Sequence, residues 1–394
     1  MEYRLLSTAC EYGKDRISAD EVNENNYIST ENMLPNRGGI EIASSVAEGK
    51  TFPAYKEGNI LLSNIRPYFK KIWFADKKGG CSNDVLVLKT NKSVDKKFLY
   101  YVLSDNNFFN YSTVTSKGTK MPRGSKTAIM KYLVPDVDMP TQKRIADILS
   151  AYDDLIENNN RRIALLEKAA QELYKEWFVR FRFPGYKTAK FENGLPEGWE
   201  IRKIGDIARV KSGYAFKSEW WSDEGVPVIK IKDIQNNTVD FSDLSKVSET
   251  HALLARNFFV KEGDLLIAMT GATIGKLAIV PFSDEKLVVN QRVGKFFLGD
   301  DPVSTVPFLY CTLQQNWLQE LILMVAGSNA AQPNISPFDI EKIKVIYNEN
   351  VVAAFNKKAS DYISQILLLK KKNQNLAKQR DLLLPRLMSG KLEV

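Results

Sequence analysis

The sequence predicts an α+β protein in which two pseudo-symmetric, mixed α/β domains are joined by an antiparallel two-helix coiled coil. Three observations support this prediction. Apolar residues between 142 and 178 are spaced alternately four and three apart, which is the 3.5-residue period of a coiled-coil seam. The same spacing returns from Phe355 onwards, and the two globular segments that precede these helices also share short motifs. The chain is therefore a tandem repeat of about 210 residues.

The two helical segments carry similar residues at matching positions. The first seam is Ile145, Leu149, Tyr152, Ile156, Asn159, Ile163, Leu166, Ala170, Leu173 and Trp177. The second is Phe355, Ala359, Tyr362, Ile366, Leu369, Asn373, Leu376, Arg380 and Leu383. Tyr matches Tyr, Ile matches Ile and Leu matches Leu at a separation of 210 positions. Each helix is therefore expected to be the seam partner of the other.

The pairing of the two seams can be deduced from their symmetry. Copies related by a two-fold axis lie antiparallel, so the numbers of facing residues should have a constant sum. Centring the seams gives a sum of 532, which places Asn159 opposite Asn373 and Trp177 opposite Phe355. An unpaired amide in a dry seam would cost about 1–3 kcal/mol. We therefore expect Asn159 and Asn373 to form a hydrogen bond that fixes the register; the alternative is that either side chain faces solvent.

Composition narrows the class of protein. The 394 residues are 44% hydrophobic and 26% charged, which is typical of a globular chain long enough for two or three domains. The net charge of +8 favours a polyanionic partner. The N-terminus has no apolar signal region and no stretch approaches 18 apolar residues, so we expect no membrane association and a cytoplasmic location.

Few residues are available for catalysis or metal binding. The three cysteines are far apart and form no CxxC pair, which indicates a reducing compartment and argues against zinc and disulfides. The single histidine, His251, is expected to serve as a surface or helix-capping residue. Catalytic triads and multi-histidine metal sites therefore lack the residues they need, and we expect neither a metal nor a cofactor.

The repeat divides the chain into consecutive parts. These are a first globular segment (1–140), a first long helix (141–178, with Thr141 as N-cap), a linker (179–198), a second globular segment (199–348), a second long helix (349–387) and a tail (388–394). In the first segment we expect strands at 56–65, 70–75, 83–90 and 128–137, a helix at 95–112 and a loop at 118–126. In the second we expect a helical start and a Gly turn within 200–216, strands at 225–234 and 286–299, a hairpin at 261–280, a helix at 306–325 and a loop at 327–336.

The loops of the two segments share a framework but differ in their side chains. Gly118 lies 209 positions before Gly327, and Pro122 lies 211 before Pro333. Around these positions, GTKMPRGSK corresponds to GSNAAQPNIS. Earlier in each segment, after a shared KEG at 56–58 and 261–263, LLSNIRPYFKK corresponds to LIAMTGATIGK. Such a pattern is expected of two binding modules that read different targets.

The stretch TGATIGK (270–276) resembles a phosphate-binding loop but is one residue short, and Leu277 stands where Ser or Thr must hold magnesium. A tight turn whose backbone can approach a phosphodiester is the better interpretation. The sequence contains no methyl-donor motif, no helicase motif and no convincing nuclease spacing.

The loops are rich in residue types that bind DNA, because Arg and Lys suit guanine and phosphate while Asn and Gln suit adenine. The candidates in the first segment are Ser63, Asn64, Arg66, Tyr68, Lys70, Lys71, Asn83, Lys117, Thr119, Lys120 and Arg123. Those in the second are Lys211, Tyr214, Lys217, Thr270, Thr273, Lys276, Asn290, Gln291, Arg292, Ser328, Asn329 and Gln332. Each alone could be an ordinary solvated residue, but they gather in matching loops.

Three blocks of the sequence resemble the specificity subunits of type I restriction–modification systems. They are QKRIADILSAYDDLIENNNRRIALLEKAAQELYKEWFVRF, the opening LPEGWEIRKIGDIA with its later KSGYAFKS, and GDLLIAMTGATIGKLAIV. The resemblance covers essentially the whole chain, although the first segment lacks the LPxxW opening. It implies two target-recognition domains that each read half of a bipartite site in double-stranded DNA.

The same resemblance implies partners and roles. The long helices would set the spacing between the half-sites and dock two modification subunits, through which restriction subunits join, and the chain itself would be non-catalytic. Outer-face residues that could contact a modification subunit, or could simply be solvated, are Glu157, Asn158, Arg161, Arg162 and Lys168. Two other hypotheses remain open: a self-contained methyltransferase–nuclease, and a coiled-coil scaffold that binds only proteins.

Overall fold

The computed structural model describes residues 2–235, 237–327 and 333–392, which form two compact units. The first unit comprises residues up to Ile156 together with those from Asn375 onwards, and the second comprises Glu157–Gln374. The boundary cuts both long helices, so each unit contains part of each. The C-terminal end of the chain thereby completes the unit that the N-terminal end begins.

The first unit is built from ten strands, three α-helices of its own and one end of each long helix among its described residues. The strands are β1 (Glu2–Leu5), β2 (Cys10–Tyr12), β3 (Arg16–Ser18), β4 (Tyr27–Ile28), β5 (Thr51–Tyr55), β6 (Ile60–Ser63), β7 (Ile72–Phe74), β8 (Gly79–Cys81), β9 (Val85–Thr90) and β10 (Leu133–Asp136). The helices are α1 (Lys96–Ser104), α2 (Asn106–Val114), α3 (Lys126–Ile129), the first part of α4 (Met139–Tyr174) and the last part of α10 (Glu349–Met388).

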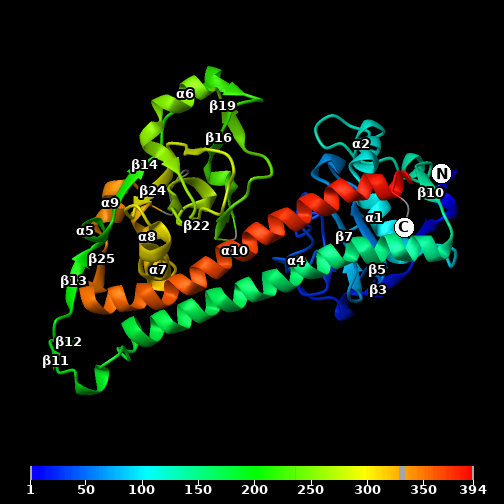
Figure 1. The fold of residues 1–394 in the computed structure, drawn as a ribbon. Coiled ribbons are helices and arrows are strands. Elements are labelled where there is room, and N and C mark those ends of the chain that lie inside the picture. Colours follow the sequence, from blue (N-terminus) through cyan, green and yellow to red (C-terminus); the bar gives the residue numbers. More distant parts are fainter. Residues whose placement is uncertain (1, 236, 328–332, 393–394) are drawn as a thin grey trace. The chain divides into compact units, whose positions relative to one another are not determined.

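The second unit repeats this order with additional elements (Figure 1). Its strands are β11 (Phe191–Glu192), β12 (Leu195–Pro196), β13 (Glu200–Lys203), β14 (Arg209–Ser212), β15 (Trp221–Ser222), β16 (Val226–Ile229), β17 (Ile234–Gln235), β18 (Thr238–Val239), β19 (Ser245–Val247), β20 (Phe259–Val260), β21 (Leu265–Ala268), β22 (Leu277–Ile279), β23 (Leu287–Val289), β24 (Val293–Phe297) and β25 (Lys344–Tyr347). Its helices are α5 (Ile204–Ile207), α6 (Glu249–Leu254), α7 (Pro302–Leu313), α8 (Asn316–Val325), α9 (Pro337–Lys342) and most of α10 (Glu349–Met388).

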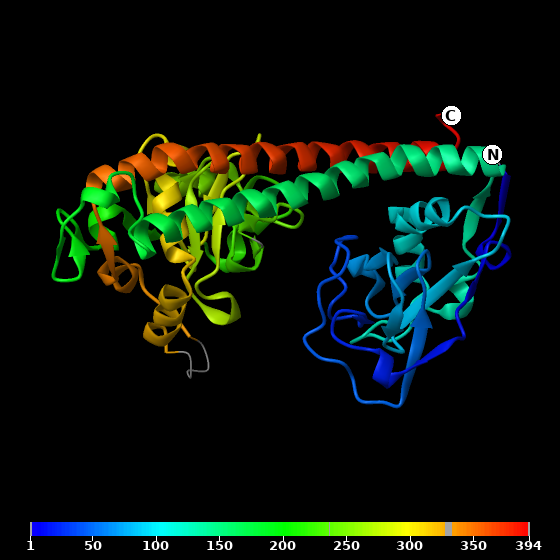
Figure 2. The same cartoon turned by 90° about the horizontal axis from the view of Figure 1, so that it is seen from below.

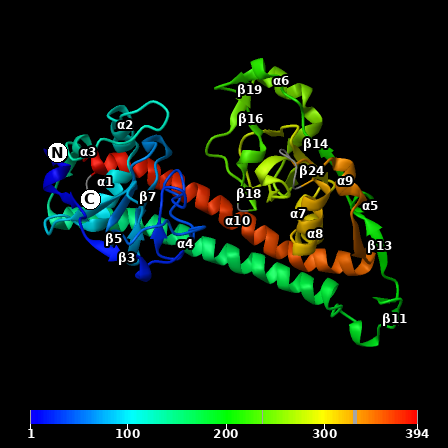
Figure 3. The ribbon, with the colours of Figure 1, turned by 180° about the vertical axis from the view of Figure 1, so that it is seen from behind.

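The strand orders show that the globular segments are copies of one fold. The sheet β2-β9-β6-β7 corresponds to β14-β24-β21-β22 in the second unit, and the antiparallel pair β1–β10 corresponds to β13–β25. A second sheet shares the core order β5-β8-β4 with β20-β23-β16, including one parallel pair in each. The first unit adds β3 beside β5, whereas the second adds β19 and β15 beside β16. In Figure 3, β14 and β24 lie side by side with α9 next to β14.

The long helices pair antiparallel within each unit (Figures 1 and 2). In the second unit, Asn159 Nδ2 donates a hydrogen bond to Asn373 Oδ1 at 2.8 Å, and the rings of Trp177 and Phe355 lie 5.8 Å apart. Both pairs have the sum of 532 that the sequence predicts, so the predicted register and hydrogen bond are present. Asn373 also donates to Asn160 Oδ1 at 2.8 Å, which the sequence did not indicate.

The helices supply much of the core of each unit. In the first unit, Ile145 and Leu149 of α4 join Leu384 and Leu387 of α10 in one buried cluster with α1 and α2. In the second, Phe178 follows α4 in a π-helical turn (Lys175–Val179) and is fully buried against the rings of Trp199, Phe308 and Phe355. Burying a side chain of this size stabilises a fold by about 1.5–3 kcal/mol, so the helices are structural parts of both units.

Several expected elements are corrected by the structure. Helix α4 begins at Met139, and Asp138 rather than Thr141 is the cap, because its carboxylate accepts the Thr141 amide at 3.0 Å. The expected helix 95–112 is broken at Asp105, whose side chain caps α2, and the expected helix 306–325 is likewise broken before Asn316. The expected strand 286–299 is two strands in different sheets, and 200–203 is a strand rather than a helix.

Candidate nucleic-acid interface

Three loops meet at one end of the four-stranded sheet in each unit. In the first unit they follow β6, precede β9 and precede α3; we call residues 63–71, 82–84 and 117–126 the first loop cluster. In the second unit they occupy the same places in the fold; we call residues 269–276, 290–292 and 333–336 the second loop cluster. The loops thus come from three separate parts of each repeat, and the fold brings them together.

The same backbone hydrogen bonds join these loops in both units. In the first they run from Asn64 N to Asp84 O, from Gly124 N to Asn64 O and from Arg66 N to Pro122 O, at 2.8, 2.9 and 2.8 Å. In the second they run from Met269 N to Arg292 O, from Ile335 N to Met269 O and from Gly271 N to Pro333 O, each at 3.0 Å. Because backbone bonds hold the frame, the side chains at its tips can differ without changing it.

Part of the first candidate set is exposed at this surface. Tyr68, Asn83 and Arg123 are exposed, as are the other candidates of the loop before α3, namely Lys117, Thr119 and Lys120. Arg123 Nη2 lies 3.1 Å from the Asp84 carboxylate. Arg66 is half-buried, and its Nε has no hydrogen-bond partner in the described part of the chain. Guanidinium, amide, hydroxyl and ammonium groups are thus gathered where a phosphodiester or base edge could bind them.

Other candidates of the first set are used within the protein. The Ser63 hydroxyl is buried and donates to Ile65 O at 3.1 Å, and Asn64 is buried beneath Gly124. Lys71 Nζ donates to Thr30 O at 2.6 Å, and burial lowers the pKa of its ammonium. Lys70 Nζ donates to Asn106 Oδ1 at 2.9 Å. The side chains of Ser63, Lys70 and Lys71 thus hold the loops in place, whereas Asn64 Oδ1 has no hydrogen-bond partner in the described part of the chain.

The second candidate set is divided in the same way. Lys276, Gln291 and Arg292 are exposed, and Asn290 and Thr273 are half-buried at the cluster. The Thr270 hydroxyl is turned inward and donates to Pro333 O at 3.2 Å. Ser328, Asn329 and Gln332 lie outside the described residues.

Tyr214 joins this cluster from another strand end, since Tyr214 N donates to Val289 O and its carbonyl accepts from Gln291 N, both at 2.9 Å. Beyond it lies an aromatic group: Trp220 stacks on the imidazole of His251 at 4.3 Å and is approached by Lys217 Nζ at 5.3 Å. Lys211, exposed on β14, lies 5.3 Å from the Phe297 ring. His251 Nδ1 lies 3.0 Å from the Ser248 hydroxyl, and Ser248 rather than His251 is the cap of α6.

Sequence reasoning missed residues that the fold adds to the first cluster. Phe69 is 38% exposed beside Tyr68, with ring centroids 4.7 Å apart, so the tip of this loop presents two neighbouring rings. Arg37 reaches the same loop from the β4–β5 connection. Phe69 could have been chosen because it adjoins Tyr68, whereas no local pattern marks Arg37.

The described side chains offer few candidates for metal binding or nucleophilic catalysis. The described residues contain no group of three or more His, Cys, Asp or Glu that could hold a metal ion. All three cysteines are buried, and burial raises the thiol pKa of Cys10 and of Cys81 to about 12, so neither is a ready nucleophile. In the part of the chain that is described, no helix is both long and apolar enough to cross a membrane.

The outer-face residues of α4 are exposed as expected, namely Glu157, Asn158, Arg161, Arg162 and Lys168. Arg161 forms an ion pair with Glu157 one helical turn earlier. A pair this exposed adds little stability, so the face is free for other contacts.

Comparison with known proteins agrees with the repeated fold. The model of the family described as "Type I restriction modification DNA specificity domain" matches residues 9–168 and again 196–376. The type I restriction enzyme MjaVIII specificity subunit of Methanocaldococcus jannaschii is 28% identical over 82% of this chain and 76% of its own length. The HindI specificity subunit of Haemophilus influenzae is 23% identical over 93% of this chain and 94% of its own.

A solved structure has a similar fold. The type I restriction–modification S subunit from M. genitalium covers 98% of this chain and 96% of its own at 18% identity, with a TM-score of 0.54. The two family matches each span one globular segment and part of the long helix that follows it, and together they cover most of the chain. This chain therefore belongs to the type I restriction–modification DNA specificity family.

Proposed function

We propose that this chain is the DNA-specificity subunit of a type I restriction–modification complex and that each loop cluster reads one half of a bipartite site in double-stranded DNA. The observation that carries the proposal is the pair of equivalent loop clusters, built on the same backbone hydrogen bonds but with different side chains. The first offers Arg66, Tyr68 and Arg123, and the second offers Lys276, Gln291 and Arg292. Two loop clusters with the same backbone hydrogen bonds but different exposed side chains suit the recognition of two different half-sites.

The subunit supplies recognition rather than catalysis in this proposal. Methyl transfer would be performed by two modification subunits, and DNA cleavage by restriction subunits that join through them. The exposed face of α4 with Asn158, Arg162 and Lys168 is the surface we assign to a modification subunit. A cytoplasmic location fits a protein that acts on cellular DNA.

The long helices would set the spacing between the half-sites. A helix of 36 residues such as α4 is about 54 Å long at 1.5 Å per residue. The antiparallel register means that a heptad removed from one helix alone breaks the pairing of Asn159 with Asn373. Equal lengthening of both helices preserves the pairing and should change the preferred spacer. An unchanged spacer in a stable, equally lengthened variant would refute this role.

The experiment that tests the function is a selection of DNA from a random library by the chain in complex with its modification partner. The expected result is two short half-sites separated by a fixed gap, with an affinity that falls steeply as salt rises. Absence of DNA binding would leave only the protein-scaffold hypothesis, and methylation by the purified chain alone would favour the self-contained enzyme.

A further inference from the structure

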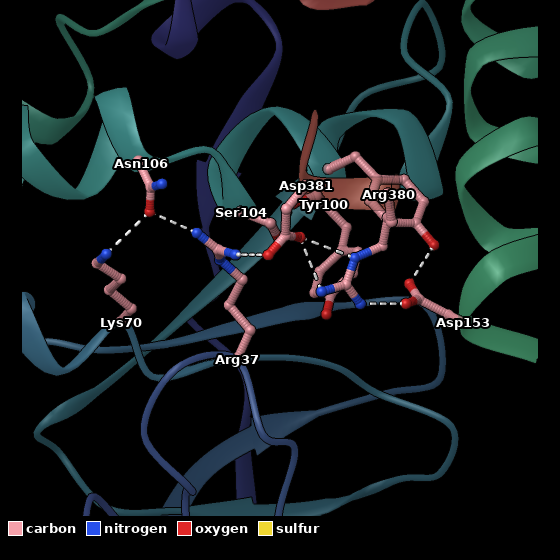
Figure 4. A network of polar contacts seen from close by, with 9 residues as sticks. Arg37, Lys70, Tyr100, Ser104, Asn106, Asp153, Arg380 and Asp381 are labelled. Atoms are coloured by element: carbon pink, nitrogen blue, oxygen red, sulfur yellow. Dashed lines mark hydrogen bonds and ion pairs between the residues drawn. The ribbon is translucent and has the colours of Figure 1, made fainter. Parts of the chain in front are cut away.

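We propose that Arg37 is a positioning residue that ties the DNA-facing loop 66–70 of the first unit to the C-terminal end of α10, so that recognition by this unit depends on the state of the helix pair. This inference rests on the proposed function. Its evidence is a continuous chain of polar contacts within the first unit, shown in Figure 4.

The loop that Arg37 contacts has a strained backbone. Arg66 and Lys70 have φ values of 50° and 52°, a left-handed conformation that is unfavourable for a residue with a side chain. The equivalent positions in the second unit are Gly271 and Gly275, with φ values of 73° and 81°, and glycine adopts this conformation easily. The first unit therefore keeps two cationic side chains at positions where its own repeat has glycine. Strain of this kind persists only where surrounding contacts impose it.

Those contacts come from the connection that carries Arg37. Asn36 N donates to Phe69 O at 2.8 Å, and Arg37 N donates to Lys70 O at 2.9 Å. The turn Pro67–Phe69 also packs against α2. The loop is thus clamped between a neighbouring loop and a helix.

The Arg37 side chain anchors the clamp. It is only 12% exposed, and its guanidinium donates to Asp381 Oδ2 at 3.3 Å and to Asn106 Oδ1 at 2.5 Å. The same Asn106 oxygen accepts from Lys70 Nζ at 2.9 Å. Burial and the nearby Arg37 charge both lower the pKa of Lys70. The Asn106 side chain at the start of α2 therefore accepts hydrogen bonds from one cationic side chain of each loop, Arg37 and Lys70.

The chain of contacts continues along α10 to α4. Asp381 Oδ1 accepts from Arg380 Nη2 at 2.9 Å, and Arg380 Nη1 donates to Asp153 of α4. Asp153 Oδ2 accepts from the Tyr101 hydroxyl of α1 at 2.5 Å. Burial opposes the charge of Arg380, but the two carboxylates prevail and raise its pKa. Charge-assisted bonds of this kind are stronger than neutral ones, so a shift of the α10 end is felt at the loop.

The second unit has no charged connection of this kind among its described residues. Neutral amides stand there instead, since Gln319 Nε2 donates to Gly275 O at 3.3 Å and Gln315 Nε2 donates to Gln171 Oε1 at 2.8 Å. Matching α1 to α7 through the shared FLY motif and α10 to α4 through the 210-residue repeat pairs Asp381 with Gln171, Arg380 with Ala170, Asp153 with Ile363 and Asn106 with Asn316. Ala170 and Ile363 are buried in the apolar core. Gln171 and Asn316 line a cavity of about 640 Å³. Among the described residues, the charged coupling through Arg37 therefore belongs to the first unit alone.

The test compares Arg37→Met with the matched control Gln171→Met, each in the full chain bound to its modification partner. Affinity is measured for the preferred site and for sites with a single base changed in either half. Arg37→Met should reduce discrimination at one half-site roughly tenfold and leave the other unchanged, and the exposed-tip variant Arg123→Ala should affect the same half-site. Gln171→Met should change neither half.

A charge swap separates positioning from simple loss of packing. Arg37→Glu combined with Asp381→Arg should recover most of the discrimination that either change alone removes. Asp381→Asn, which preserves shape, covers the case in which Arg37→Met fails to fold, as judged by its melting temperature. Equal loss at both half-sites, or unchanged discrimination in folded Arg37→Met and Asp381→Asn, would overturn the inference. A wild-type protein without any bipartite preference would instead overturn the proposed function.

Discussion

The two units share a frame but differ in what lies between that frame and the long helices. In the first unit, Arg37, Asp381, Arg380 and Asp153 form a polar chain from loop to helix. In the second, Ala170 and Ile363, which match Arg380 and Asp153, are buried in an apolar cluster, and Gln171, which matches Asp381, lines a cavity beside it. The strand order and loop bonds that survive in both units are therefore the part needed to present a recognition surface. The contacts between the globular segment and the long helices can be either polar or apolar.

The largest effect on stability is expected in the apolar core of the second unit. Phe355→Ala removes a fully buried ring that contacts Tyr174, Trp177 and Phe178. The expected loss of unfolding free energy is about 3–5 kcal/mol, measured by denaturant titration. Leu368→Ala on the same helix, at a half-exposed position, is the control and should cost far less. A small loss for Phe355→Ala would mean that the helix pair is not part of the second core.

A buried ion pair distinguishes the second sheet from the first. Lys295 Nζ lies 2.8 Å from Asp264 Oδ2, and both side chains are nearly inaccessible. The equivalent residues of the first unit are Val87 and Asn59, as the pairing of Lys295 with Leu266 and of Val87 with Leu61 shows. Lys295→Met would leave the carboxylate buried without its cation and should cost about 3 kcal/mol.

The double variant Lys295→Met/Asp264→Asn is the matched control, because it replaces both charged residues with uncharged ones, as in the first unit. It should recover part of the lost stability. If the single and double variants are equally unstable, the pair is not the reason for the effect.

The polar chain of the first unit should be weaker than the apolar core of the second. Asp153→Ala removes the acceptor of the Tyr101 hydroxyl and of Arg380. Because the Asp153 side chain is 31% exposed, water can replace part of what is lost. We expect a loss of about 1–3 kcal/mol in thermal unfolding, with Asp154→Ala, an exposed neighbour, close to wild type. A loss as large as that of Phe355→Ala would remove the contrast between the units.

The amide pair of the seam should show coupling. Asn159→Leu leaves Asn373 without one of its partners and should cost about 1–2 kcal/mol. Asn159→Leu/Asn373→Leu removes both amides, so it should be more stable than either single variant and more prone to shifted registers. Additive losses in the double-mutant cycle would show that the two amides do not act as a pair.

The smallest effect should have the opposite sign in the two units. Arg66→Gly relieves a left-handed conformation and should increase the free energy of unfolding by about 0.5–1 kcal/mol, since the relief exceeds the entropic cost of glycine. Gly271→Ala introduces that strain in the second unit and should be destabilising by a similar amount. If Arg66→Gly lowers stability, the Arg66 side chain contributes more to the fold than its backbone strain costs.

The sequence reveals the periodic features and hides those that join distant residues. The register of Asn159 with Asn373 follows from a seam that repeats every seven residues, so arithmetic was sufficient. The break at Asp105 was missed because the apolar pattern continues through it, although Asp is a good cap for a new helix.

The sequence predicts which loops form the candidate interface better than it predicts which of their side chains are exposed. The matching loops of the two repeats predict which parts of the chain form the loop clusters. Ser63, Lys70 and Lys71 nevertheless form hydrogen bonds within the protein, and Asn64 is buried. A residue type predicts what a side chain can bind but not which way it points. Arg37 depends on contacts with residues 106 and 381, a separation that no local pattern records.

The most direct test of two independent readers is to map methylated sites in cells that carry this chain with its modification partner, and to repeat the mapping with the tip variants Tyr68→Ala/Arg123→Ala and Gln291→Ala/Arg292→Ala. The account predicts a bipartite methylated site in which the first variant relaxes one half and the second relaxes the other. Relaxation of the same half by both variants, or of the whole site by either, would contradict it.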